Sequence, residues 1–390
     1  MFNVRHRRPR HYTRCNIRSF VRIAGSLVAV VALAGDAHAF EPSDGSAELL
    51  FTFNALLYSA SSVANPRDRA ELHQFLLDYE ANEALDRAYP LRRDVASSVR
   101  LWPANLRQRA LAFVLSHKTA ATNYNALVLQ LVGPPPGFVP LRQAIPGGQA
   151  EQSLAADAHV LSALLQEAYA AADLQTTWPR YAAHWRAAQV STERVRGIQA
   201  SVVHYVQSRQ HAPLEASSVM SNPLMPGGSG VTSMYSDGHF VMLLGPTLSV
   251  PETETLIAHE LTHPLLNHLF KTDPRARRAL HNAECVFDYV RRDPDAARVT
   301  AYVYNGWESY YAESLVRAIS HHLMHTPELG HGFVLTPALT WELERYETGH
   351  FSFSEFTIRS LAKLSRDYCI DTPARRVALP QGRHTRFLYQ

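Results

Sequence analysis

Apolar residues recur at helical spacing through the first half of the chain. A spacing of three to four residues puts such side chains on one face of a helix, from which they can pack into a core. Five stripes follow this spacing, within the ranges 49–57, 72–79, 106–114, 154–168 and 195–205. The histidines of this half are scattered and form no catalytic cluster in the sequence. We therefore expect residues 40–212 to form a helical N-terminal region that walls one side of a cleft.

The pattern changes after residue 212. Residues 213–230 are rich in proline, glycine and serine, a composition typical of a connection or flap. Apolar residues then concentrate at 231–235 and 240–244, which predicts two strands, and the Asp237-Gly238 pair between them is a hairpin signal. The expected fold is therefore α+β and mostly helical, with a small antiparallel sheet in a second region at residues 213–390.

A longer amphipathic segment follows the predicted hairpin. Ser249 and Glu252 fit an N-terminal capping box with a proline in the first turn. Leucine and isoleucine then recur at helical spacing as far as residue 269. Pro264 has no N–H to donate to the carbonyl of Glu260, so we expect the helix either to kink there or to end, with a new turn after it.

This helix carries the sequence HELTH, an H-E-x-x-H motif. His259 and His263 are four residues apart, so they lie on one helical face, close enough for both imidazoles to bind one Zn²⁺ ion. Glu260 lies about 100° round the helix, where its carboxylate can take a proton from water without being a metal ligand. The alternative is a structural helix that carries two ordinary histidines.

Catalytic zinc usually has three protein ligands, so a third is expected outside the motif. His268 is five residues beyond His263 with no glycine between them, which does not fit the metzincin pattern. Later glutamates are the other candidates: Glu284, Glu308 and Glu313. Spacing alone leaves Glu284 and Glu313 nearly equal, whereas Glu308 and Glu313 lie about 140° apart on one helix and should not both face the metal.

Glu313 lies in a predicted helix whose apolar stripe runs from Trp307 to Ala318. Arg317 is one turn beyond Glu313 on the same face, where it can orient the glutamate carboxylate. The histidines further along this helix are expected to form a solvated face apart from the site: His321, His322 and His325.

The sequences HELTHPLLN and YNGWESYYAESLVRAI together resemble those of a bacterial family of exported proteins that is carried as a domain of unknown function. Members of that family pair an HEFxH-type helix with a later tryptophan and an N-E-S-L-V-R-A helix, and the family is similar to the gluzincin zinc metallopeptidases. Residues of this chain match both motifs: His259, Glu260 and His263 match the first, and Trp307, Glu313 and Arg317 match the second.

The resemblance is sharpest from about residue 231 to residue 323. It implies a zincin-like region in which Glu313, rather than Glu284, is the third zinc ligand, with Arg317 and Trp307 supporting the ligands. The chain departs from the family pattern at Ala312, where the family tends to have asparagine, and at residues 261–262 inside the first motif. Neither departure removes a ligand or the base, and the resemblance implies no particular substrate.

Residues 1–39 look like a bacterial-type signal peptide. Seven arginines precede an apolar run at residues 23–34, and Ala37-His38-Ala39 suits a signal peptidase, so we expect cleavage after Ala39 and a periplasmic or secreted protein. The apolar run is too short to span a bilayer, so no stable membrane anchor is expected. The leader has a net charge of +6 and the whole chain +3, so the remainder carries −3, which gives no sign of nucleic-acid binding.

Two cysteines, Cys285 and Cys369, remain outside the leader. In the oxidising compartment that a signal peptide implies, they are a candidate disulfide. Two buried free thiols are the alternative.

These observations predict a zinc-dependent metallohydrolase, most simply a peptidase acting on a peptide or protein, with Glu260 as general base. Tyrosines near the third-ligand helix are candidate oxyanion donors: Tyr302, Tyr304, Tyr310 and Tyr311. Residues 240–244 are the candidate edge strand for pairing with an extended peptide. Two alternatives remain, an exported binding or assembly protein that holds metal without turnover and a zinc amidase of cell-wall material. The oligomeric state is left open.

Overall fold

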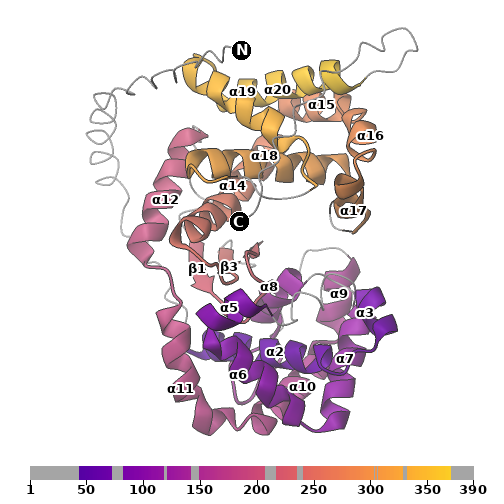
Figure 1. Cartoon of the computed structure of the whole chain (residues 1–390), viewed down its shortest axis with the longest axis vertical. Coiled ribbons are helices and arrows are strands. Elements are labelled where there is room, and N and C mark those ends of the chain that lie inside the picture. The colour runs from indigo at the N-terminus through magenta and orange to yellow at the C-terminus, as the bar shows by residue number, and fades with distance from the viewer. Residues whose placement is uncertain are drawn as a thin grey trace, which may run out of the picture. The chain divides into compact units, whose positions relative to one another are not determined.

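The computed structural model of the chain describes residues 44–72, 82–117, 121–141, 149–206, 217–234, 240–302, 304, 306–327 and 332–369. These residues form many helices and one three-stranded sheet, so the fold is mostly helical α+β, as the periodicity predicts (Figure 1). The expected signal peptide and the Asp237-Gly238 turn lie outside the described residues. Within the described ranges, no helix has both the length and the apolar character needed to cross a membrane.

Helix α2 (Asp44–Ser61) is the centre of a first hydrophobic core. Every residue from 49 to 61 is buried, which is typical of a helix packed on all sides. Inside this core, Asn54 donates from Nδ2 to Oδ1 of Asn125 over 2.6 Å, so these polar groups are hydrogen-bonded rather than left unpaired. The other helices of this half are α3 (Pro66–Leu72), α5 (Glu83–Ala88), α6 (Pro90–Ser98), η1 (Val99–Leu101), α7 (Ala104–His117), α8 (Ala121–Leu131), α9 (Gln149–Ala156), α10 (Ala158–Ala171) and α11 (Leu174–Ala187).

The sheet has the strand order β1-β3-β2, with β1 (Ser217–Ser221), β2 (Gly230–Met234) and β3 (Phe240–Leu244). Strand β3 pairs antiparallel with β2, as the hairpin signal predicts, and parallel with β1. The predicted antiparallel sheet is therefore a mixed sheet, because β1 lies in the stretch that we expected to be a connection or flap. The expectation that residues 240–244 form an edge strand is wrong, since β3 is the central strand.

Strand β3 lies between two hydrophobic cores. Val241 and Leu243 belong to the first core, whereas Met242 and Leu244 belong to a second core that contains the H-E-x-x-H helix. Successive side chains of a strand point to opposite faces, so a strand buried on both faces needs a continuous apolar run rather than an alternating one. The sequence FVMLL has that character.

The second core is built almost entirely from helices, and α14 (Val250–Thr272) packs against α18 (Trp307–Leu323) within it. Its other helices are α12 (Thr192–Tyr205), α15 (Pro274–Asn282), α16 (Val286–Val290), α17 (Pro294–Tyr302), α19 (Thr336–Thr348) and α20 (Phe353–Tyr368). The two cores do not divide at residue 212, because α12 packs with the second core and Met220 packs with the first.

Helix α14 begins as the sequence predicts. The Oγ of Ser249 accepts a hydrogen bond from the N–H of Glu252, and the Glu252 carboxylate accepts one from the N–H of Leu248 over 2.8 Å. The helix then continues through Pro264 to Thr272, so the alternative in which it ends at the proline is wrong. One unbroken helix therefore carries the whole motif.

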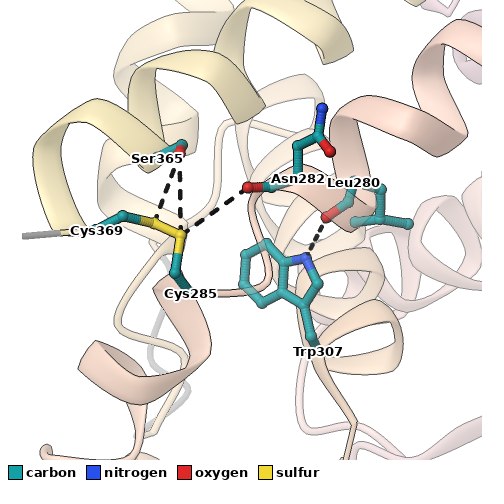
Figure 2. Close-up of a disulfide and its surroundings, with 6 residues drawn as sticks. All are labelled: Leu280, Asn282, Cys285, Trp307, Ser365 and Cys369. Atoms are coloured by element: carbon teal, nitrogen blue, oxygen red, sulfur yellow. Dashed lines mark hydrogen bonds between the residues drawn. A yellow bond between two sulfur atoms is a disulfide. The ribbon is translucent and has the colours of Figure 1, made fainter. Parts of the chain in front are cut away.

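A disulfide and a tryptophan fasten the helices around α18, as Figure 2 shows. Cys285, at the start of α16, is bonded to Cys369, which follows the last residue of α20, with 5.3 Å between their Cα atoms. The indole N–H of Trp307, at the start of α18, donates to the carbonyl of Leu280 on α15 over 2.7 Å. The disulfide thus ties α16 to α20, and the hydrogen bond ties α18 to α15.

Candidate metal centre

His259 and His263 lie on one face of α14, one turn apart. Their Nε2 atoms are 3.2 Å from each other, and their ring centroids are 4.9 Å apart. Both side chains are only partly exposed. The four-residue spacing has therefore placed two ring nitrogens within reach of one ion, as the motif predicts.

Glu313 comes to the same point from α18. Its Oε1 lies 3.5 Å from Nε2 of His259, its Oε2 lies 3.3 Å from Nε2 of His263, and its side chain is only 3% exposed. Glu313 can reach the two histidines because α14 and α18 pack directly against each other. Two imidazole nitrogens and one carboxylate thus converge from helices that are about fifty residues apart in the chain.

The three side chains fit a metal ion. Their ligand atoms all lie within 4.8 Å of one another, and no other group of this kind occurs among the described residues. A tetrahedral zinc ion with bonds of about 2.0–2.2 Å separates its ligand atoms by roughly 3.3–3.6 Å. The separations of 3.2, 3.3 and 3.5 Å between the three side chains are close to that range.

The charges within the group favour an ionised carboxylate. Burial alone would raise the pKa of Glu313, but the two neighbouring imidazoles outweigh burial and hold this pKa well below its usual value. Burial alone would lower the pKa of His263, but the hydrogen bond and the negative charge of Glu313 outweigh that effect and raise it. A metal ion would therefore compete with a proton for the His263 imidazole, whereas the lowered pKa of Glu313 favours the charged carboxylate that a metal needs.

Arg317 supports the Glu313 carboxylate. Its Nε donates to Oε1 of Glu313 over 2.9 Å, and its guanidinium carbon lies 4.1 Å from the centre of the Phe333 ring. The one-turn spacing on α18 accounts for the hydrogen bond, as the sequence predicts. The aromatic ring adds a cation–π contact that limits where the guanidinium can move.

Glu260 is 4% exposed and follows His259 on α14, and its negative charge contributes to the raised pKa of His263, so it lies near the potential ligands. Its Oε2 accepts a hydrogen bond from Oγ1 of Thr232, on strand β2, over 2.9 Å. Sequence reasoning missed Thr232, because nothing in the local pattern shows that a strand residue 28 positions earlier faces the motif. This position is compatible with the role of general base that the motif predicts.

The alternative third ligands lie elsewhere. Glu284 has a side chain 66% exposed and lies 3.8 Å from His281 at the end of α15. Glu308 is exposed in the first turn of α18, five residues from Glu313 and on a different face of the helix. His268 is on α14 but is not in the group of potential ligands. The packing of α14 on α18 thus selects Glu313 from the candidates that spacing left open.

Trp307 does not contact the ligands through its polar atom. Its indole N–H is used in the bond to Leu280, and its ring packs 6.4 Å from that of Phe287 and 5.4 Å from that of Tyr311. Its effect on the site is to hold the first turn of α18, six residues before Glu313.

Among the four candidate tyrosines, Tyr304 lies at the metal group. Burial, the charge of Glu313 and a hydrogen bond to Glu313 all raise the pKa of Tyr304, which keeps its hydroxyl protonated. Tyr310 instead donates to the carbonyl of Gly332 over 2.7 Å, and the hydroxyl of Tyr311 lies 3.2 Å from that of Ser360, both inside the core. The side chain of Tyr302 lies outside the described residues.

The histidines at the end of α18 are used in other contacts. Nδ1 of His321 lies 3.0 Å from the Thr326 hydroxyl, and Nε2 of His322 lies 2.8 Å from the Glu347 carboxylate. His325 follows the helix with a positive φ and is exposed. None of the three belongs to a potential metal group among the described residues.

Comparison of the chain with protein-family models, with curated proteins and with solved structures gives no match. The resemblance to an exported bacterial family therefore stays a prediction, and so does the zincin-like fold. Any function has to be argued from the geometry of this site.

Proposed function

We propose that the protein is a zinc-dependent metallohydrolase, most simply a peptidase. The observation that carries this proposal is the convergence of His259, His263 and Glu313, with the Glu260 carboxylate near enough for its charge to act on His263. Two imidazoles and one carboxylate match the ligand set of many catalytic zinc sites and leave a coordination position for a reactant. A carboxylate that is not a ligand but lies next to the ion has the position of a general base.

When bound, zinc would supply a Lewis acid that polarises a substrate carbonyl and lowers the pKa of water at the site. Glu260 takes the proton that the attacking water loses and passes it to the leaving nitrogen as the carbon–nitrogen bond breaks. The products are a carboxylic acid and an amine, so no further reactant is needed. Arg317 holds the Glu313 carboxylate in place throughout.

Strand β2 supports a peptide as the substrate. With β3 in the centre of the sheet, β2 is the edge strand nearest to Glu260, and within the described residues it pairs with β3 alone. An extended peptide that added to the edge of β2 that does not pair with β3 would bring its backbone alongside the base. This assigns to residues 230–234 the role that the sequence assigned to residues 240–244.

We also propose that the protein works outside the cytoplasm. Support comes from the bond between Cys285 and Cys369, because disulfides persist mainly in oxidising compartments. A periplasmic or secreted location agrees with the leader-like sequence of residues 1–39. Fractionation of cells that produce the full chain, followed by N-terminal sequencing, tests both the location and the expected cleavage after Ala39.

The test of the proposed function uses the variant Glu260→Gln. The zinc content of the wild-type protein and the variant is measured by mass spectrometry, and hydrolysis is measured on an unbiased peptide library and on purified cell-wall material. We expect about one zinc per chain in both proteins and peptide cleavage by the wild type alone. Cleavage of cell-wall material only would favour the amidase, and bound zinc without any hydrolysis would favour the binding protein. Unchanged turnover in Glu260→Gln would rule out the mechanism.

A further inference from the structure

We infer that Gly230 and Thr232, two alternate residues of strand β2, together hold the Glu260 carboxylate in its reactive position. Both act as positioning residues, because neither lies among the potential metal ligands. The inference rests on the proposed function, in which Glu260 is the base. Strand β2 would then have two roles: it positions the base, and it binds the substrate along the edge that does not pair with β3.

The pairing of β2 with β3 fixes the face on which these two residues lie. Gly230 is opposite Leu244, and Thr232 is opposite Met242. Residues directly opposite each other in an antiparallel pair present their side chains on the same face of the sheet. Met242 and Leu244 belong to the core that contains α14, so the Gly230 and Thr232 face is the one turned to that helix.

Thr232 makes a directional contact with the base. Its hydroxyl donates to Oε2 of Glu260 over 2.9 Å, a distance typical of a hydrogen bond to a carboxylate. This bond occupies one carboxylate oxygen and fixes the rotation of the carboxylate plane. The other oxygen, Oε1, is left to exchange a proton with the reactants.

Gly230 provides the space that the base occupies. A Cβ built on this glycine would lie 2.4 Å from Oε1 of Glu260, 2.7 Å from Cγ and 2.8 Å from Cδ, all closer than real Cβ contacts. The backbone φ of Gly230 is outside the left-handed region, so it is the lack of a side chain, not backbone freedom, that the position uses. Any other residue at position 230 must push the Glu260 side chain away from its observed position.

The two residues constrain different parts of the Glu260 side chain. The Thr232 hydroxyl donates to Oε2, and the missing side chain of Gly230 leaves room for Oε1, Cγ and Cδ. Because proton transfer and nucleophilic attack depend steeply on geometry, a displacement of about 1 Å can lower the rate roughly 100-fold. We therefore expect changes at either position to lower kcat while the metal ligands stay in place.

The test compares four variants of the zinc-loaded protein. Thr232→Val removes the donor but keeps the shape, Thr232→Ser restores the hydroxyl, and Gly230→Ala adds the Cβ. The matched control is Thr340→Val on α19, which removes a hydroxyl that donates to the carbonyl of Thr336 in its own helix, outside the site. For each variant we measure zinc content, kcat and KM on a cleaved peptide, together with the thermal unfolding midpoint as a check on folding.

We expect the zinc content of all four variants to equal that of the wild type. Thr232→Val should lower kcat about 10-fold or more, as expected for the loss of a hydrogen bond to a charged group, and Gly230→Ala roughly 100-fold. Thr232→Ser and Thr340→Val should stay within about 3-fold of the wild type, and KM should change little, because the geometry of the base acts on the chemical step. Wild-type kcat in both Thr232→Val and Gly230→Ala would overturn the inference.

A crystal structure of the Gly230→Ala variant separates this inference from the proposed function. If the wild type proves to be no hydrolase, the kinetic arm fails for a reason that has nothing to do with β2. The structure still decides, because we expect the Glu260 carboxylate to be displaced from its wild-type position whether or not the protein is an enzyme. A Glu260 carboxylate that superimposes on its wild-type position in this variant, with strand β2 unmoved, would overturn the inference.

Discussion

Arg317 donates a hydrogen bond from Nε to Oε1 of Glu313 over 2.9 Å, one helical turn further along α18. Oε2 of Glu313 lies nearest to His263, and Oε1 is shared between Arg317 and His259. The guanidinium is itself held against the ring of Phe333. The orientation of the proposed third ligand therefore depends on a residue that does not touch the metal position.

Replacing Arg317 should weaken metal binding. The variant Arg317→Gln keeps part of the side-chain stem but loses the charge and the fixed donor, and loss of a group that orients a ligand typically costs about 10- to 100-fold in metal affinity. Competition for zinc against a chromophoric chelator measures the change. The matched control is Arg345→Gln on α19, which removes an exposed arginine that pairs with Glu342. Equal zinc affinity in the Arg317→Gln variant and the wild type would contradict the proposed role.

Tyr304 is the tyrosine that we expect to stabilise the transition state. The variant Tyr304→Phe should lower kcat roughly 10- to 100-fold at saturating zinc, because one hydrogen-bond donor to the developing oxyanion is lost. Tyr289→Phe is the control, since that tyrosine stacks on Tyr368 away from the metal group. If Tyr304→Phe instead weakens zinc binding and leaves kcat at saturating zinc unchanged, the hydroxyl supports the Glu313 ligand and not the oxyanion.

Local patterns were enough to predict most of the helices and the arrangement of the motif. The helix around residues 49–57 is indicated by the regular spacing of its apolar residues. The start of α14 is indicated by Ser249 and Glu252, which are three positions apart and share a hydrogen bond. Strand β1 was missed because it pairs in parallel with β3, more than twenty positions away, within a serine- and proline-rich stretch. Its sequence, SSVMS, has neither the alternation of apolar and polar residues nor the continuous apolar run that predicts a strand.

The same distinction between local and long-range features applies to the site. Helical geometry alone predicts that His259 and His263 lie on one face of their helix, and that Glu313 and Arg317 lie on one face of theirs. The choice of Glu313 over Glu284 depends on how α18 packs on α14, and spacing alone could not make it. Gly230 faces the base only through the register of β2 on β3, so its role could not be predicted from the sequence.

The disulfide should contribute strongly to stability. The double variant Cys285→Ser, Cys369→Ser opens a loop closed across 84 positions, and the chain-entropy model gives a loss of up to about 4–5 kcal/mol in the free energy of unfolding. Urea denaturation of metal-free protein measures it, with the oxidised wild type as reference. The reduced wild type should resemble the double variant. Equal free energies of unfolding for the oxidised wild type and the double variant would contradict this expectation.

Asp273 should make stability depend on acid pH. A hydrogen bond from Ser354 lowers the pKa of Asp273, and the N–H groups of Arg275 and Ala276 at the start of α15 add to that effect. A lowered folded-state pKa means that the contribution is fully present above the unfolded value of about 3.9 and is lost as pH falls through the lower, folded value. Ionised Asp273 therefore stabilises the folded state at neutral pH, and this stabilisation is lost in acid.

The variant Asp273→Ala tests the direction of this pH dependence. It should lower the free energy of unfolding by about 1 kcal/mol at pH 7, the usual effect of losing an N-cap. The difference from the wild type should shrink as the pH is lowered below about 3.9, where the unfolded-state carboxylate takes up a proton. Denaturation curves at a series of pH values measure it, with Asp288→Ala as an exposed control on α16. A difference that grows toward acid pH would contradict the assignment.

The proposed function depends most on whether His259, His263 and Glu313 hold one zinc ion. The most direct test is a crystal of the zinc-loaded protein measured just above and just below the zinc absorption edge. We expect a single anomalous peak that disappears below the edge and lies about 2.0–2.2 Å from both Nε2 atoms and from an oxygen of Glu313. A peak elsewhere, or none at these three side chains in protein saturated with zinc, would contradict the central claim.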